Sequence, residues 1–504
     1  MKRTAQKILS ILLVMLSIPL LLWSIWALHP ETLQEEQPQE TEPSVTVQAS
    51  NIETTQPPTT VPTTEPTTVL ITAPTTVPES TTTKRPAKKP KPTKPVQKPE
   101  PPKTEPKLPN ERQFLKVTAP YAETTYLSSK SDRSDPKTSP FLFGTCDEIT
   151  GTAAFDKDAY FITKSGFYVK QDCCQTFRGE PLPPNTARAG LGRQNELAIA
   201  LDRKVPFIGQ VKPQKYYVGY LTKPYNIETF TGEYIDFVFY DTKTAKGDVT
   251  FLHHPIVSHA KWIEQNQENS TATLRVYFKQ KGRFYGYHAY WAENGDLHIR
   301  FANPPSKTPR VLLDAGHGGK DCGAIGANGT HESQVVLYLA QKVRENLLVR
   351  GIQVEMTRTE DYFVTLDKRQ QLARDTSADL VVAIHANAAP AKKDKSKWMG
   401  PEVYYYRGYS KKPAACIQKE LISAWQDIYA HQAAMRANIV PNDGGVRFYP
   451  FQVTRIEEHP AILVECGYLS HPTECLALSK QENQNRLAKA IADGIVAYLR
   501  SEST

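Results

Sequence analysis

Three apolar segments that each lead to an ionisable residue constrain the fold of this 504-residue chain more than any other feature. The first passes through Asp314 into a glycine-rich turn that carries His317, the second ends at His385, and the third ends at Glu465. The apolar segments themselves are residues 311–313, 380–384 and 461–464. Short apolar runs are typical of strands buried on both faces, and open α/β sheets bind their ligands at the carboxyl ends of such strands. We therefore expect an α/β sheet with a site along one edge.

The region from residue 307 to residue 504 alternates between strand and helix patterns. A helix is expected to begin at about Glu332, because apolar residues then recur at helical spacing until Gly351, which suits a helix C-cap. Ser479 and Glu482 have the spacing of a capping box, which predicts a last helix that extends to about Leu499. Further strands are predicted at residues 352–356 and 402–406, and further helices at residues 366–374 and 412–429. This alternation predicts an α/β domain with a mixed sheet and helices on both faces.

Residues 113–306 have a β pattern. Strand-like runs follow one another at short intervals, separated by Gly, Pro, Asn and Asp, and no long helical pattern interrupts them. The length suggests two small β domains, residues 113–205 and 206–306, with a break near Val205. The first has some resemblance, around residues 190–195, to the immunoglobulin-like modules of bacterial wall proteins. Aromatic residues in strands are more often part of the core than of a sugar-binding surface, so the pattern favours a core role here.

The first 112 residues are expected to form a membrane anchor and a linker. The run from Ile8 to Leu28 is uncharged over 21 residues, about 31 Å as a helix, which matches a bilayer core. Because it lacks a clear small-x-small cleavage site, an uncut single-pass anchor over residues 1–28 is favoured over a cleaved signal peptide. Basic residues before the run predict that the rest of the chain lies outside the cell, in the wall. Residues 29–112, rich in Thr, Pro and Lys, are too poor in apolar side chains to fold.

The charge distribution does not indicate a nucleic-acid partner. The formal net charge is +8, and the dense basic block, nine Lys or Arg between residues 84 and 107, lies within the proline-rich linker. A nucleic-acid-binding protein is instead expected to carry its basic residues on a folded face.

His317, Glu332 and His385 have the composition of a catalytic zinc site. Such a site has three protein ligands and one position open to water. An ionisable group at the end of a buried strand loses hydration, and a metal ion compensates this loss directly. A set of hydrogen-bonded side chains without metal would also satisfy the pattern, since no compact HExxH-type motif is present. Spacing alone leaves both interpretations open.

Several motifs occur together in the order found in zinc-dependent N-acetylmuramoyl-L-alanine amidases. They are Leu313-Asp314-Ala315-Gly316-His317-Gly318-Gly319-Lys320, Gly323-Ala324-Ile325-Gly326, Glu332, Thr357-Arg358, Ile384-His385-Ala386-Asn387 and Leu463-Val464-Glu465-Cys466-Gly467-Tyr468-Leu469-Ser470. From about Arg310 to Arg500 the chain resembles the catalytic domain of this family. Ala315 stands where proline is common, and Cys466 stands where threonine or another small residue is usual. Neighbours on a strand face opposite sides, so the Cys466 thiol should point away from the site.

The resemblance implies that His317, Glu332 and His385 hold Zn²⁺ and that Glu465 is the catalytic carboxylate. It implies hydrolysis of the amide bond between the lactyl group of muramic acid and L-alanine of the peptidoglycan stem peptide. Asn387 and Arg358 are candidates for contacts with the substrate, although Arg358 also suits a structural role.

Two alternative functions remain at this stage. The chain could be a wall-binding protein with an inactive amidase fold, but the presence of all four site residues argues against this. It could also be a zinc peptidase that cleaves within the stem peptide, because ligands at strand ends do not identify the scissile bond.

Overall fold

A computed structural model describes residues 111–503, except for residues 123, 126–139, 156–157, 211–212, 218–223, 229–231, 391–393 and 431–444. The predicted anchor, residues 1–28, and residues 29–110 of the predicted linker lie outside the described residues. Among the residues that are described, no helix has the length and hydropathy needed to cross a membrane.

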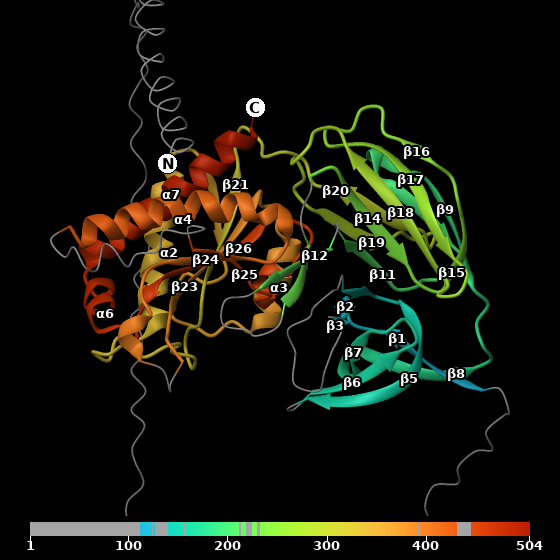
Figure 1. The fold of residues 1–504 in the computed structure, drawn as a ribbon, viewed down its shortest axis with the longest axis horizontal. Coiled ribbons are helices and arrows are strands. Elements are labelled where there is room, and N and C mark those ends of the chain that lie inside the picture. Colours follow the sequence, from blue (N-terminus) through green and yellow to red (C-terminus); the bar gives the residue numbers. More distant parts are fainter. Residues whose placement is uncertain are drawn as a thin grey trace, which may run out of the picture. The chain divides into compact units, whose positions relative to one another are not determined.

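A six-stranded antiparallel sheet forms the first folded part of the chain (Figure 1). Its strand order is β3-β7-β6-β5-β1-β8. The strands are β1 (Arg112–Val117), β3 (Thr124–Thr125), β5 (Cys146–Phe155), β6 (Asp158–Thr163), β7 (Tyr168–Lys170) and β8 (Cys174–Gly179). A separate two-stranded sheet consists of β2 (Tyr121–Ala122) and β4 (Phe141–Leu142). Leu115, Val117, Phe141 and Phe167 are buried together as its core.

Two five-stranded sheets follow and share one core. One has the order β15-β9-β10-β20-β19 and the other β11-β14-β18-β17-β16. Their strands are β9 (Asn185–Leu191), β10 (Leu197–Leu201), β11 (Phe207–Gln210), β14 (Tyr234–Phe239), β15 (Thr242–Lys246), β16 (Val249–Thr250), β17 (Val257–Asn266), β18 (Thr271–Phe278), β19 (Tyr287–Trp291) and β20 (Leu297–Phe301), and β12 (Pro213–Tyr217) pairs separately with β13 (Pro224–Glu228).

The boundary that we predicted near Val205 does not coincide with a division between sheets. Strand β10 precedes Val205 but pairs with β20, and Leu197 and Ile199 are buried with Phe237 from beyond the predicted break. The division between the sheets instead falls between β8 and β9. Sequence pattern located the strands, but it contains no information on which distant strand β10 joins.

The C-terminal part contains a mixed six-stranded sheet with the order β22-β21-β23-β26-β24-β25. Strands β22, β21, β23 and β26 are parallel, whereas β24 runs antiparallel to β26 and parallel to β25. The strands are β21 (Arg310–Ala315), β22 (Gln353–Met356), β23 (Leu380–Asn387), β24 (Glu402–Tyr405), β25 (Val446–Phe448) and β26 (Ala461–Tyr468). The sheet is therefore mixed, as predicted, and its four parallel strands end along one edge.

Helices cover both faces of this sheet, as the alternation of buried residues requires. Leu313 and Val382 point to the face packed by α2 (Glu332–Leu348), α4 (Lys411–Ile428) and α7 (Gln481–Glu502). Their strand neighbours Leu312 and Val381 point to the other face, where Ala373 of α3 (Leu366–Asp375) joins them. Figure 1 shows α4 and α7 side by side, and both helices contribute to the same core cluster. The helix predicted to begin at about Glu332 and the helices predicted at residues 366–374 and 412–429 are confirmed.

The predicted capping box at Ser479 and Glu482 is wrong. A short helix that we did not predict, α6 (Pro472–Leu478), has Ser479 as its C-cap residue, and the Ser479 hydroxyl donates to the carbonyl of Cys475 at 2.7 Å. The residue before α7 is Lys480, with no side-chain cap, and Glu482 accepts a bond from Arg486 instead. The Ser479 hydroxyl is thus used by the preceding helix.

Candidate active site

The turn after β21 holds His317 at the carboxyl edge of the sheet. His317 has a φ of 58°, and it is followed by Gly318 and Gly319 with φ of 121° and 58°, so three successive residues occupy the left-handed region. Glycine is the residue that adopts this region without steric cost, which explains the Gly-Gly pair. Before the turn, Gly316 lies so close to His385 that an added Cβ would be 2.3 Å from the ring Cε1. The absence of a side chain at Gly316 therefore makes room for the second imidazole.

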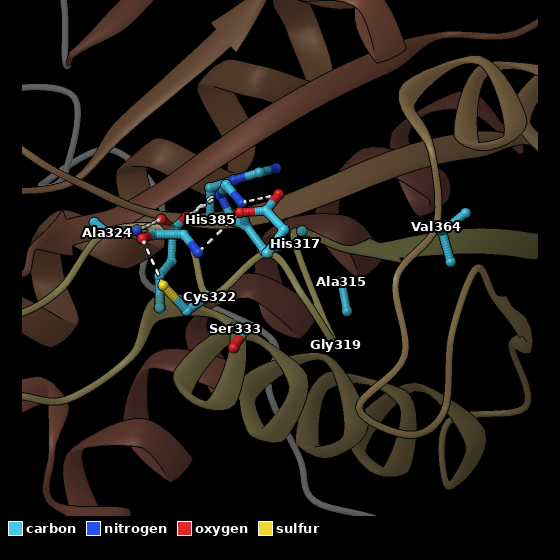
Figure 2. Close-up of polar contacts among 12 residues, drawn as sticks. Ala315, His317, Gly319, Cys322, Ala324, Ser333, Val364 and His385 are labelled. Carbon is cyan, nitrogen blue, oxygen red and sulfur yellow. Dashed lines mark hydrogen bonds and ion pairs between the residues drawn. The ribbon is translucent and has the colours of Figure 1, made fainter. Parts of the chain in front are cut away.

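The three predicted ligands converge from three different elements. His317 follows β21, Glu332 is the first residue of α2, and His385 lies near the end of β23. One ligand atom from each residue lies within 4.8 Å of the other two. Glu332 Oε1 is 3.1 Å from His317 Nε2 and 3.0 Å from His385 Nδ1. In Figure 2 the two imidazoles lie next to each other, and their ring centroids are 5.0 Å apart.

Further polar groups fix the orientation of these ligands. Asp321 Oδ2 lies 2.9 Å from His317 Nδ1, which leaves Nε2 facing Glu332. Glu332 accepts backbone N–H bonds from Ala324 at 2.8 Å and from Ala386 at 3.1 Å. Carboxylate partners of this kind set the tautomer of a metal-binding histidine. Asp321 was not among the predicted site residues, although its position four residues after His317 in the same glycine-rich loop was a usable signal.

The donor set fits a divalent metal ion. Two imidazoles and one carboxylate are the ligand types of catalytic zinc sites. Burial works against ionisation of Glu332, but its hydrogen bonds with His317 and His385 outweigh burial and hold its pKa below the ordinary range. Burial likewise opposes protonation of His317, and the bonds to Glu332 and Asp321 outweigh it and raise its pKa. The three groups thus form a cluster in which positive charge, from protons or from a cation, is stabilised.

Glu465 lies beside this cluster in a different environment. It is the register partner of His385 on the neighbouring strand β26 and is only 8% exposed. Its Oε2 is buried and has no hydrogen-bond partner among the described residues. Burial, reinforced by the charges of Glu332 and Glu402, raises the pKa of Glu465 well above its ordinary value. Its neighbour Cys466 is buried in the core cluster on the helix-packed face, as the alternation along the strand predicted.

Asn387 contacts a second buried carboxylate, Glu402, which the sequence analysis placed only in a strand. Glu402 lies opposite Glu465 on β24. Its Oε2 accepts bonds from Asn387 Nδ2 at 3.2 Å, Tyr404 at 2.6 Å and Tyr468 at 3.1 Å, and its Oε1 accepts one from Arg447 Nε at 2.8 Å. No local motif marks Glu402, because its place in the site depends on the pairing of β24 with β26.

Arg358 lies beneath the site and binds the backbone around it. It is fully buried, with 0% exposure. Its guanidinium donates to four backbone carbonyls at 2.8–3.0 Å, those of Ala315, Gly316, Ser333 and Glu360. These carbonyls lie at the end of β21, in the first turn of α2 and in the loop after β22. These contacts agree with the structural alternative for Arg358, and substrate binding by this residue stays a prediction.

The fold and the site together define a class of catalytic domain, in which a mixed α/β sheet carries two histidines and one glutamate at the carboxyl ends of its parallel strands and a second glutamate at the start of the helix that follows the first strand. The sequence profile described as N-acetylmuramoyl-L-alanine amidase matches residues 311–497. Uncharacterized protein YqiI of Bacillus subtilis (strain 168) is 32% identical over 201 residues, which cover 39% of this chain and 88% of that protein.

Two named amidases extend the comparison. The germination-specific N-acetylmuramoyl-L-alanine amidase of Bacillus subtilis (strain 168) is 31% identical over 205 residues, covering 37% of this chain and 78% of that protein. N-acetylmuramoyl-L-alanine amidase AmiC2 of Nostoc punctiforme, whose structure is solved, is 35% identical to this chain, with a TM-score of 0.34. The match covers 39% of this chain and 99% of the AmiC2 chain. The chain belongs to the N-acetylmuramoyl-L-alanine amidase family, a family of hydrolases that act on amide bonds.

Proposed function

We propose that this protein is a zinc-dependent N-acetylmuramoyl-L-alanine amidase that hydrolyses the bond between the lactyl group of muramic acid and L-alanine of the stem peptide. One observation carries the proposal. The ligand atoms of His317, Glu332 and His385 converge within 4.8 Å of one another beside a buried glutamate, Glu465, whose Oε2 has no partner in the described residues.

In this proposal His317, Glu332 and His385 hold the zinc ion. When bound, the ion would supply a water molecule of lowered pKa and would polarise the carbonyl of the scissile amide. Asp321 holds His317 in the tautomer that directs Nε2 toward the ion, and the N–H groups of Ala324 and Ala386 hold the Glu332 carboxylate.

Glu465 moves the proton. Its Oε2 accepts a proton from the attacking water, whose oxygen becomes bonded to the lactyl carbonyl carbon. The same atom then donates the proton to the alanine nitrogen as the carbon–nitrogen bond breaks. Burial without a hydrogen-bond partner suits this role, because an oxygen already saturated by donors would be a poor proton acceptor.

We also propose that the enzyme acts in the cell wall while tethered to the cell membrane. The uncharged run from Ile8 to Leu28 would be the single-pass anchor, and residues 29–111, which precede strand β1, would be the spacer. Recovery of the protein from culture fluid with a new N-terminus just after Ala27 would contradict the tether.

The purified full-length chain incubated with muropeptides tests the reaction. The expected product is a stem peptide with a new N-terminal alanine, identified by mass, together with one zinc per chain. Cleavage between amino acids would instead support a peptidase, and no cleavage would support a wall-binding role. Stoichiometric zinc in a His317→Ala, His385→Ala double variant would contradict the ligand assignment.

A further inference from the structure

Glu402 lies in a position where a second carboxylate is costly. Strand β24 runs antiparallel to β26 and pairs Glu402 directly with Glu465, and both residues are only 8% exposed. Like charges directly opposite each other on neighbouring strands are destabilising. Neither carboxylate can move to solvent, so the arrangement requires groups that compensate one of the two.

Four donors converge on Glu402. Arg447 Nε bonds its Oε1 at 2.8 Å, and its Oε2 receives the hydroxyls of Tyr404 and Tyr468 and the amide of Asn387. All four partners are N–H or O–H donors, so both oxygens of Glu402 are used as acceptors. Glu402 is thus a fixed acceptor, unlike Glu465, whose Oε2 has no partner among the described residues.

The fixed acceptor determines the orientation of Asn387. The Asn387 Nδ2 donates to Glu402 at 3.2 Å, and its Oδ1 accepts the N–H of Ala388 at 2.8 Å. An acceptor on one side and a donor on the other permit only one orientation of the side-chain amide. Asn387 lies two residues after His385 on the same strand and is half-buried. After these two bonds, an asparagine amide retains one hydrogen and one lone pair, which complement the C=O and N–H of a peptide group.

We propose that Glu402 is a positioning residue that acts through Asn387, and that Asn387 binds a peptide group of the stem peptide next to the scissile amide. This proposal rests on the proposed function and adds to it the residue pair that recognises the peptide side of the substrate.

A double-mutant cycle on the full-length zinc enzyme tests the coupling. Asn387→Ala and Glu402→Gln are each expected to raise KM for a purified muropeptide about tenfold, because each removes the oriented hydrogen bonds to the peptide. The double variant should have the same KM as Asn387→Ala alone, since Glu402 has no effect on binding once Asn387 is absent. KM is the chosen readout because a charge effect of Glu402 on Glu465 would change kcat. Zinc content should remain stoichiometric in all three variants.

Two further variants separate this role from a general loss of structure. Glu402→Asp keeps the carboxylate but withdraws the acceptor from Asn387 by one methylene, so it should also raise KM. If Glu402→Gln does not fold, Glu402→Asp alone tests whether Glu402 positions Asn387. Glu457 is a matched control, because it is a buried glutamate that accepts from Arg407 at 2.7 Å, and Glu457→Gln should leave KM unchanged.

An unchanged KM in Glu402→Gln, or effects that multiply in the double variant, would overturn the role of Glu402. A wild-type chain that releases no alanine-terminated peptide would instead overturn the proposed function, so the two failures are distinguishable.

Discussion

Replacing Gly316 with alanine should weaken zinc binding by displacing His385. An alanine Cβ would lie 2.3 Å from His385 Cε1, 2.5 Å from Nε2 and 2.7 Å from Nδ1. Ordinary carbon contacts are about 3.5 Å, so the ring must move by roughly 1 Å. The backbone offers little relief, because the Gly316 N–H donates to the Ile384 carbonyl at 3.1 Å, which ties the turn to the strand that carries His385.

The size of the effect follows from the tolerance of metal sites. Ligand distances in such sites vary by about 0.2 Å, so a displacement of about 1 Å removes a good ligand geometry. Changes in the residues that merely orient a ligand already cost 10- to 100-fold in metal affinity. We therefore expect Gly316→Ala to lower zinc affinity at least about 100-fold, equivalent to about 2.7 kcal/mol.

Competition with a chromogenic chelator would measure the zinc affinity, and circular dichroism would show that the fold is retained. Gly190→Ala is the matched control, because a Cβ at Gly190 meets nothing within 4 Å. Unchanged zinc affinity in a folded Gly316→Ala variant would refute the reasoning, since it would mean that His385 is not a zinc ligand.

Three further outcomes are expected. Glu465→Gln should retain zinc while kcat falls by roughly 100- to 10,000-fold, because the amide cannot accept the proton; loss of zinc would make Glu465 a ligand, and full activity would place the base elsewhere. Burial raises the pKa of Glu474 from 4.5 to about 7, so its contribution to stability is present below about pH 4.5 and is lost as the pH rises through 7. Urea unfolding of the metal-free chain should show a loss of roughly 3 kcal/mol from this group between acidic and alkaline pH, and Glu474→Gln should flatten that dependence. Arg358→Ala should lower the free energy of unfolding by about 3 kcal/mol or more, because four carbonyls lose a buried donor; a raised KM with unchanged unfolding would instead support substrate binding.

Sequence alone was sufficient where the signal was local. The apolar runs before His317, His385 and Glu465 located strands β21, β23 and β26, since a strand buried on both faces must be apolar along its length. The same runs placed three of the site residues together, because parallel strands end at one edge of the sheet. Helices α2, α3 and α4 were located by a local signal as well, because a helix that buries one face has apolar residues at helical spacing.

Capping could not be resolved from spacing. The serine and glutamate at 479 and 482 have the separation of a capping box, but Ser479 bonds the carbonyl of Cys475 at the end of α6. A serine hydroxyl can serve the helix before it or the helix after it, and the choice depends on where the chain turns.

The remaining features were decided by pairing between residues far apart in the chain. Strand β10 joins β20 about a hundred residues later, so the break predicted near Val205 does not separate the sheets. Glu402 enters the site only because β24 pairs with β26 in the antiparallel direction, which sets it opposite Glu465. Hydrophobic periodicity reports which face of an element is buried, and it is identical for every partner that could bury that face. The strand partners, and with them the place of Glu402 in the site, were therefore determined only by the tertiary structure.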